Sequence, residues 1–218
     1  MNKCDLKVKV CGITRLQDCE NAISLGVSFL GFILYEGSPR FIDPDEALKI
    51  WTSLNSDQTF SVAVDVDPEP SHLYEIVNRG FDFYQLHFPS NTNLDRISEW
   101  ARIVGKEKLW LAPKVAPGEI FPEQFLPYAD TFLLDSYSVN KFGGTGKVSD
   151  WNQFAKLKDK FHSKKWVLAG GLSPENLPAA LCATCAKHLD LNSGIETEPG
   201  IKSFSKMKKA FSILLDHN

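Results

Sequence analysis

A thiol and a carboxylic acid are the groups in this sequence whose positions best fit catalysis. Cys11 follows the extended run 7–10 and precedes Gly12, whose backbone can turn sharply. Asp135 ends the apolar run 131–134, where a partly desolvated carboxyl could stay protonated and act as an acid. A base and an acid across one cavity suit proton removal and donation on a small substrate. The competing interpretation is structural, because free cysteines usually pack and acids often close loops.

Other polar side chains follow further β-rich runs and could hold a substrate. Gln85, His87 and Asp190 each stand at or near the end of such a run. Arg40 lies in a loop, where its guanidinium fork could orient a carboxylate, although a lone arginine is more often a surface charge. We expect Gln85, His87 and Asp190 to line a substrate pocket, and both interpretations of Arg40 stay open at this point.

Two pairs of small residues follow the last two β-rich runs. Gly170 and Gly171 follow one run, and Ser193 and Gly194 follow the next. Backbone N–H groups in such turns can approach an anion closely, and many barrels hold a phosphate at this place. Glycines in tight turns are the alternative for either pair alone. Two pairs on neighbouring runs favour phosphate binding.

The glycine-rich run 143–147 contains Gly144, which we expect in the same pocket. The run resembles part of a nucleotide P-loop, but it lacks the spacing GxxxxGK[ST], and Val148 stands where Ser or Thr is needed. A nucleotide P-loop is therefore rejected. No GxGxxG pattern indicates a dinucleotide, and no cluster of histidines and acids indicates a metal. The sequence predicts no cofactor.

Short β-rich runs alternate along the chain with segments whose apolar residues recur at helical spacing. The eight runs are 7–10, 29–34, 60–66, 83–86, 109–115, 131–134, 166–169 and 189–191. Eight β/α pairs of about 27 residues each, without a linker, predict a single (β/α)8 TIM barrel with a parallel eight-stranded core over residues 1–218. A two-domain α/β arrangement is the alternative. In a barrel, the residues named above meet at the carboxyl ends of the strands.

Some connecting segments carry local signals. Asp43 precedes Pro44 and is expected to cap a helix. The proline-broken segment 122–128 predicts a weak helix at most. Cys182 and Cys185 form a CxxC pattern in an expected helix. Because two leucines precede Cys185 at i−4 and i−8, we expect its side chain to face the core, which disfavours a redox or zinc site.

Composition narrows the class of protein. The 218 residues are 43% hydrophobic and 23% charged, with a net charge of −3, which argues against nucleic-acid binding through a basic face. No apolar run approaches the roughly 20 residues that cross a bilayer, and the charged N-terminal segment does not read as a signal peptide. Five cysteines, an odd number, fit a reducing compartment. We expect a cytoplasmic protein with neither nucleic-acid nor membrane partners.

Taken in order, these motifs resemble one family, phosphoribosylanthranilate isomerase of tryptophan biosynthesis. The matching segments are collinear and span nearly the whole chain. They are KVCGIT (9–14), GFILY (31–35), SPR (38–40), QLH (85–87), LLD (133–135), GGTGK (143–147), LAGGL (168–172), PEN (174–176) and DLNSGIE (190–196).

The resemblance implies a cofactor-free barrel, either monomeric or homodimeric. The implied reaction is an Amadori rearrangement of N-(5'-phosphoribosyl)anthranilate to 1-(2-carboxyphenylamino)-1-deoxyribulose 5-phosphate, the third step from chorismate. Cys11 falls at the family's base and Asp135 at its acid. Arg40 falls at the arginine that holds the anthranilate carboxylate, and the glycine turns fall at the phosphate site.

The sequence departs from the family pattern at several places. The family usually has Gly and an acid after the QLH motif, where this chain has residues 88–90. It usually has Phe and Asn where this chain has Asp65 and Asp67, and Ser where this chain has Asn192. Two other functions stay open. Another sugar-phosphate isomerase or epimerase would need a metal set or two catalytic aspartates. A barrel that binds a phosphorylated ligand without turnover is favoured only by the changed 88–90 segment.

Overall fold

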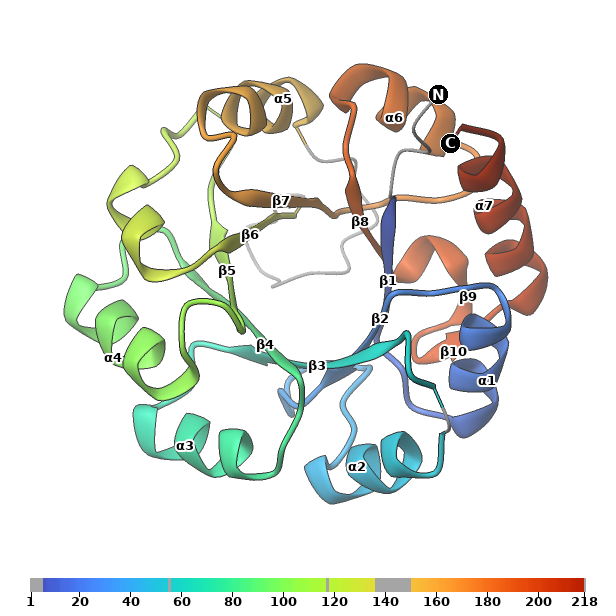
Figure 1. Ribbon diagram of the computed structural model, residues 1–218, viewed down its shortest axis with the longest axis horizontal. Helices are drawn as coiled ribbons and strands as arrows, with labels where there is room; N and C mark the ends of the chain where they lie inside the picture. The colour runs from blue at the N-terminus through green and yellow to red at the C-terminus, as the bar shows by residue number, and fades with distance from the viewer. Residues whose placement is uncertain (1–5, 55, 117, 136–149, 218) are drawn as a thin grey trace.

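Eight parallel strands close into a barrel in which each strand pairs with the next and β8 pairs back with β1 (Figure 1). The computed structural model describes residues 6–54, 56–116, 118–135 and 150–217. The strands are β1 (Lys7–Cys11), β2 (Phe29–Ile33), β3 (Phe60–Val66), β4 (Phe83–Pro89), β5 (Leu109–Lys114), β6 (Thr131–Leu134), β7 (Lys165–Leu168) and β8 (His188–Leu191). The predicted barrel class is confirmed.

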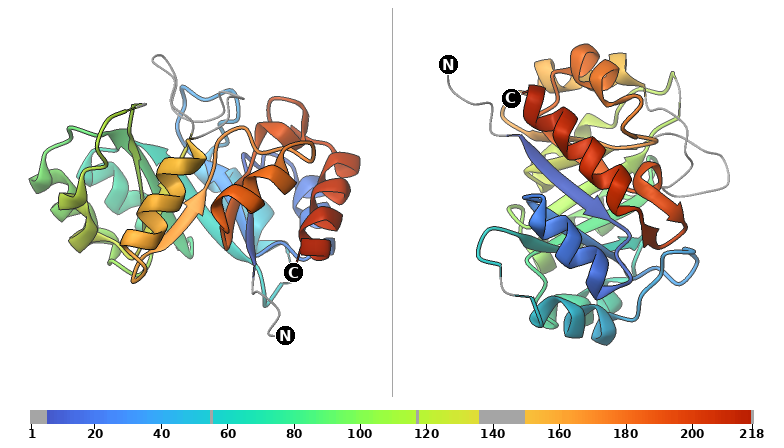
Figure 2. Two further views of the ribbon diagram at one scale, coloured as in Figure 1. Left: turned by 90° about the horizontal axis from the view of Figure 1, so that it is seen from above. Right: turned by 90° about the vertical axis from the view of Figure 1, so that its right-hand side faces the viewer.

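Helices surround the barrel in chain order (Figures 1 and 2). They are α1 (Leu16–Ser24), α2 (Pro44–Thr52), α3 (Pro70–Asn78), α4 (Leu94–Val104), α5 (Trp151–Lys160), α6 (Leu177–Thr184) and α7 (Phe204–His217). Asp43 caps α2 as predicted, accepting hydrogen bonds from the backbone N–H groups of Asp45 and Glu46. In the described part of the connection between β5 and β6, the chain forms a 3-10 helix, η1 (Glu123–Tyr128), and not an α-helix. Pro127 within it lacks the N–H that an α-helix would need.

A short hairpin follows β8 outside the barrel. After the 3-10 turn η2 (Ser193–Ile195), β9 (Glu196–Glu198) pairs antiparallel with β10 (Ile201–Lys202). The chain reverses at Gly200, whose φ of 84° suits glycine. Figure 1 shows this hairpin beside β1 and α1. This hairpin was not predicted from the sequence, and it supplies two charged side chains, Glu196 and Lys202, to the site described below.

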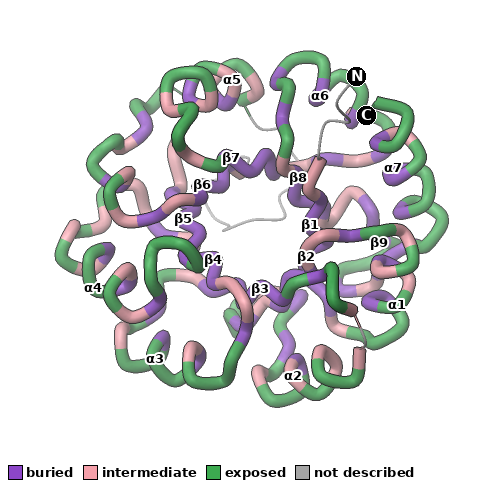
Figure 3. Tube along the Cα trace, in the orientation of Figure 1, coloured by how far each residue is buried: buried purple, intermediate pink, exposed green. Residues whose placement is uncertain are grey.

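Successive side chains of each strand point alternately outward and into the barrel, and this alternation creates two separate apolar regions. Tyr84, Leu86 and Phe88 of β4 pack outward in the core between strands and helices, whereas Phe83 packs inside the barrel. Figure 3 shows the resulting ring of buried strands and the exposed outer faces of the helices. Aromatic rings gather at the amino ends of the strands, where Phe29 lies 5.0 Å from Trp110 between ring centroids. The interior is thus filled at the amino end, and polar groups lie toward the carboxyl end.

The expectation that Cys185 faces the core is wrong. Helix α6 ends at Thr184, and Cys185 follows it with a left-handed φ of 46°, so helical spacing no longer applies to its side chain. Cys182 and Cys185 are both exposed free thiols. Thr184 is buried instead, and its hydroxyl donates a hydrogen bond to the carbonyl of Ala180.

Within the described ranges, no helix has both the length and the apolar character needed to span a membrane.

Candidate active site

A cavity of about 320 Å³ opens at the carboxyl ends of the strands. Its lining includes nine of the residues predicted from the sequence: Cys11, Arg40, Gln85, His87, Asp135, Gly170, Gly171, Asp190 and Ser193. Two predicted residues are not among them. Gly194 packs against the backbone of Leu172, where a Cβ atom would clash with the carbonyl oxygen. Gly144 lies outside the described residues.

The end of β1 is shaped by Gly12. Its φ is +72°, and a Cβ atom there would lie 2.8 Å from both Arg40 Cδ and Asn192 Oδ1. A larger residue would be strained and would push these two side chains away. Gly12 therefore lets the β2–α2 loop and the end of β8 close around Cys11.

Beside Cys11, a buried ion pair joins β1 to β8. Lys9 and Asp190 are register partners, and Lys9 Nζ lies 3.0 Å from Asp190 Oδ2. Burial raises the pKa of the Cys11 thiol, and the positive charge of Lys9 opposes this rise. Burial also raises the pKa of Asp190 against the effect of Lys9. Of the nearby ammonium groups, Lys9 favours both the thiolate and the carboxylate most strongly, and Lys202 has a smaller effect on each.

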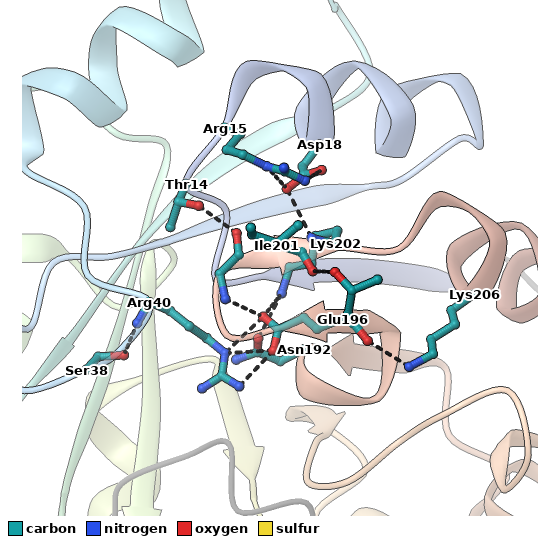
Figure 4. A network of polar contacts seen from close by, with 12 residues as sticks. Thr14, Arg15, Asp18, Ser38, Arg40, Asn192, Glu196, Ile201, Lys202 and Lys206 are labelled. Atoms are coloured by element: carbon teal, nitrogen blue, oxygen red, sulfur yellow. Dashed lines mark hydrogen bonds and ion pairs between the residues drawn. The ribbon is translucent and has the colours of Figure 1, made fainter.

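A second charged cluster fixes Arg40 (Figure 4). Arg40 Nε donates to Glu196 Oε1 at 2.9 Å, and Nη2 donates to Glu196 Oε2 at 2.8 Å. Lys202 Nζ donates to Glu196 Oε1 at 2.7 Å and to Asn192 Oδ1 at 2.9 Å. Glu196 uses only two of the guanidinium nitrogens, so Nη1 is not engaged by this carboxylate. Arg40 is a buried, oriented fork at the cavity wall, not a surface charge.

The β4 wall of the cavity carries an amide and a neutral imidazole. Gln85 Nε2 lies 2.8 Å from His87 Nε2. Burial, with a smaller effect of the Lys9 charge, lowers the pKa of His87 to about 3, so the ring is neutral. With the amide as donor, His87 Nε2 accepts and Nδ1 carries the proton.

Two buried oxygens of cavity-lining residues, one on β4 and one on β8, have no hydrogen-bond donor among the described residues. They are Gln85 Oε1 and Asp190 Oδ1, and both residues line the cavity. Because an unsatisfied buried acceptor is costly, a ligand that brings hydroxyl or N–H donors suits this cavity. A sugar has such donors.

The turn after β7 presents backbone to the cavity. Gly170 and Gly171 have φ values of 89° and 63°, which favour glycine. Asn176 holds the turn, since its Nδ2 donates to the carbonyl of Gly171 at 2.8 Å and its Oδ1 accepts from the N–H of Ser173 at 2.9 Å. This is a rigid, glycine-lined surface of the kind that accommodates an anion.

The reacting groups proposed from the sequence border one space. Asp135 follows β6, is half-buried and lines the same cavity as Cys11 of β1. By contrast, the departures at 88–90 are not among the described lining residues. Phe88 makes an edge-to-face contact with Trp100 at 5.4 Å between ring centroids, and the Ser90 hydroxyl donates to Glu119 at 2.6 Å. Nothing in these contacts favours the alternative of a barrel that binds without turnover.

Sequence reasoning missed the importance of Lys9, Glu196 and Lys202. A signal existed for Lys9, because a residue two positions before Cys11 on a strand points to the same side. No comparable signal existed for Glu196, which lies 156 residues from its partner Arg40 and reaches it only through the short hairpin.

The fold and the cavity define a (β/α)8-barrel protein with a polar site at the carboxyl ends of its strands. Within this class, the model of the N-(5'phosphoribosyl)anthranilate (PRA) isomerase family matches residues 8–212, and the chain belongs to this family.

Individual relatives agree with the family assignment. The N-(5'-phosphoribosyl)anthranilate isomerase of Maridesulfovibrio salexigens is 36% identical over 216 residues, which covers 96% of this chain and 98% of the relative. The phosphoribosyl anthranilate isomerase structure from Thermus thermophilus aligns with a TM-score of 0.81 at 31% identity, covering 98% of this chain and 100% of that one. A further isomerase was solved in complex with reduced 1-(o-carboxyphenylamino)-1-deoxyribulose 5-phosphate; its TM-score is 0.77 at 28% identity, with coverages of 95% and 97%.

Proposed function

We propose that the chain converts N-(5'-phosphoribosyl)anthranilate to 1-(2-carboxyphenylamino)-1-deoxyribulose 5-phosphate in tryptophan biosynthesis. Family membership makes it an isomerase. The observation that carries the proposal is that Cys11 and Asp135 line one cavity together with the oriented fork of Arg40. A base, an acid and a carboxylate-binding group are the three elements that this rearrangement requires.

Substrate binding uses the groups that the cavity offers. Arg40 binds the anthranilate carboxylate, and the glycine turn at 170–171 with Ser193 binds the phosphate. Ribose hydroxyls donate to the free acceptors of Gln85 and Asp190. With both ends held, the ribose spans the space between the acid and the base.

The chemistry proceeds in three steps. Asp135, in its protonated form, donates to the ribose ring oxygen, the C1'–O bond breaks, and an iminium forms between C1' and nitrogen. The iminium acidifies C2', and the Cys11 thiolate takes the C2' proton to give an enolamine. Protonation at C1' and loss of the enol proton then give the C2' ketone.

Turnover with purified protein tests the proposal. Adding N-(5'-phosphoribosyl)anthranilate should cause a steady loss of its fluorescence as the rearranged product forms. Saturable binding without any loss of substrate would instead support a barrel that only binds the ligand.

We expect Asp135→Asn to lower kcat by about 10²–10⁴-fold with little change in KM. The amide keeps the shape of the carboxyl group but cannot deliver the proton that opens the ring. Steady-state kinetics measure the effect. Asp130→Asn is the matched control, because Asp130 is a half-buried carboxyl just before the amino end of β6, away from the cavity. Unchanged turnover in Asp135→Asn would remove this residue from the mechanism.

We expect Arg40→Ala to raise KM more than it lowers kcat, with a loss in kcat/KM of about 10–100-fold. Removal of a charge-assisted hydrogen bond costs about 1.5–3 kcal/mol, and a carboxylate clamp acts on substrate and transition state alike. Steady-state kinetics separate the two constants. Arg79→Ala, which removes a surface partner of Asp45, controls for loss of an arginine. A lower kcat at unchanged KM would contradict the clamp.

A further inference from the structure

Lys9 is a buried cation that the proposed reaction leaves without a role. Its side chain is 1% exposed, in the interior of β1, two residues before Cys11. An isolated buried ammonium is costly, so its retention needs a partner. Asp190 provides one at 3.0 Å. The pair alone, however, does not explain why a lysine stands beside the thiol, since two apolar residues would fill this space without cost.

Gly31 shows that Lys9 and Cys11 share one space. Gly31 of β2 is the register partner of Cys11. A Cβ atom on Gly31 would lie 2.8 Å from Lys9 Cε, 3.0 Å from Lys9 Nζ and 2.9 Å from Cys11 Sγ. Because Gly31 has no side chain, the ammonium end of Lys9 and the sulfur of Cys11 can both occupy the space beside it.

The charged groups around Cys11 come from several elements. Lys9 is on the same strand as Cys11, Asp190 is on β8, and Lys202 of β10 is already paired with Glu196. His87 faces the site from β4 but is neutral, and Asp135 lines the same cavity after β6.

These neighbours act on the thiol in opposite directions. Burial disfavours the thiolate most strongly, Lys9 favours it, Asp190 disfavours it, and Lys202 favours it least. Lys9 is thus the strongest group in favour of ionisation.

We propose that Lys9, held in place by Asp190, is a positioning residue that stabilises the Cys11 thiolate and so makes this sulfur usable as a base. This inference rests on the proposed function, because a thiolate is needed only if Cys11 removes a proton. It deepens that function by naming the group on which the base depends. Lys9 itself does not touch the substrate in this scheme.

Thiolate titration in the intact protein tests the inference without any turnover assay. The ultraviolet absorbance of the thiolate is followed against pH, and the same curve from a Cys11→Ser partner variant is subtracted to remove the other cysteines. Lys9→Met keeps the length of the side chain and removes the charge. We expect the apparent pKa of the thiol to rise by about one to three pH units, which lowers the thiolate fraction at a fixed pH by about tenfold or more.

Two further variants control for the loss of a buried lysine. Lys202→Met removes another buried lysine close to the site, and it should raise the apparent pKa of the Cys11 thiol much less than Lys9→Met does. Lys9→Met with Asp190→Asn removes both charges of the pair, which protects the fold from an unpaired buried carboxylate. In the double variant the apparent pKa of the Cys11 thiol should still be higher than in the wild type, because Lys9 acts on the thiol more strongly than Asp190 does.

The outcomes distinguish this inference from the proposed function. A Cys11 titration that is the same in wild type, in Lys9→Met and in the double variant would overturn the role of Lys9. Failure of the wild-type protein to turn over N-(5'-phosphoribosyl)anthranilate would overturn the proposed function, whatever the titration shows. Full turnover by Cys11→Ser would overturn only the assignment of Cys11 as the base. A higher Cys11 pKa in Lys9→Met, together with a pH–rate profile shifted to higher pH in the same variant, would support both the role of Lys9 and the proposed function.

Discussion

Cys11→Ser is expected to lower kcat by about 10²–10⁴-fold, the usual contribution of a positioned general base, while the barrel keeps its fold. Serine nearly matches cysteine in shape, so the contacts of this buried side chain at the end of β1 are kept. A serine hydroxyl ionises far less readily than a thiol, and neither Lys9 nor any other neighbour can make it a comparable base. The loss should therefore appear in kcat and not in KM.

Steady-state turnover, circular dichroism and equilibrium binding of a product analogue together measure this effect. Normal analogue binding by an inactive variant separates lost chemistry from lost structure. Cys182→Ser is the matched control, because Cys182 is an exposed thiol on α6, away from the cavity. An unimpaired Cys11→Ser enzyme would mean that another group removes the C2' proton.

The pattern of strands was predictable because a parallel barrel buries both faces of its strands. Runs such as 166–169 are continuously apolar, and eight of them in alternation with helical segments close a barrel. The cavity residues were predictable for a related reason. Cys11, Asp135 and Asp190 each stand at a strand end, and the barrel topology brings all carboxyl ends to one rim.

Tertiary contacts, the exact ends of helices and very short strands were not predictable in the same way. The expected inward position of Cys185 was wrong because helix α6 stops one residue earlier, and element boundaries carry little periodic signal. The hairpin of β9 and β10 is too short for alternation to show. Consequently the sequence indicated Arg40 as a ligand clamp but not the carboxylate that orients it.

That carboxylate carries the largest expected effect on stability. Glu196 is 4% exposed and accepts hydrogen bonds from Arg40, from Lys202 and from the N–H of Gly200. Glu196→Gln would leave two buried cations facing a neutral amide. Removing one partner of a buried ion pair costs about 3–5 kcal/mol. For a chain of this size, we expect Tm to fall by roughly 6–20 °C.

The exposed neighbour on the same strand is the matched control. Glu198→Gln removes the same charge two residues away, where a surface carboxylate contributes at most about 1 kcal/mol. Thermal and urea unfolding of the two variants compare the sites. Equal destabilisation by Glu196→Gln and Glu198→Gln would show that the buried cluster does not hold the hairpin to the barrel.

Acid should reduce the effect of Glu196→Gln. Burial alone would raise the pKa of Glu196, but hydrogen bonds from Arg40 and the charge of Lys202 outweigh burial and hold the pKa below its ordinary value of 4.5. A carboxylate with a lowered pKa stabilises the fold above the ordinary value, and this contribution is lost as the pH falls through the lower, folded value. The difference in unfolding free energy between wild type and Glu196→Gln should therefore be full at about pH 7 and should narrow on acidification. A difference that stays constant into the acid range would contradict the ion-pair account and would leave only the shape of the side chain as its cause.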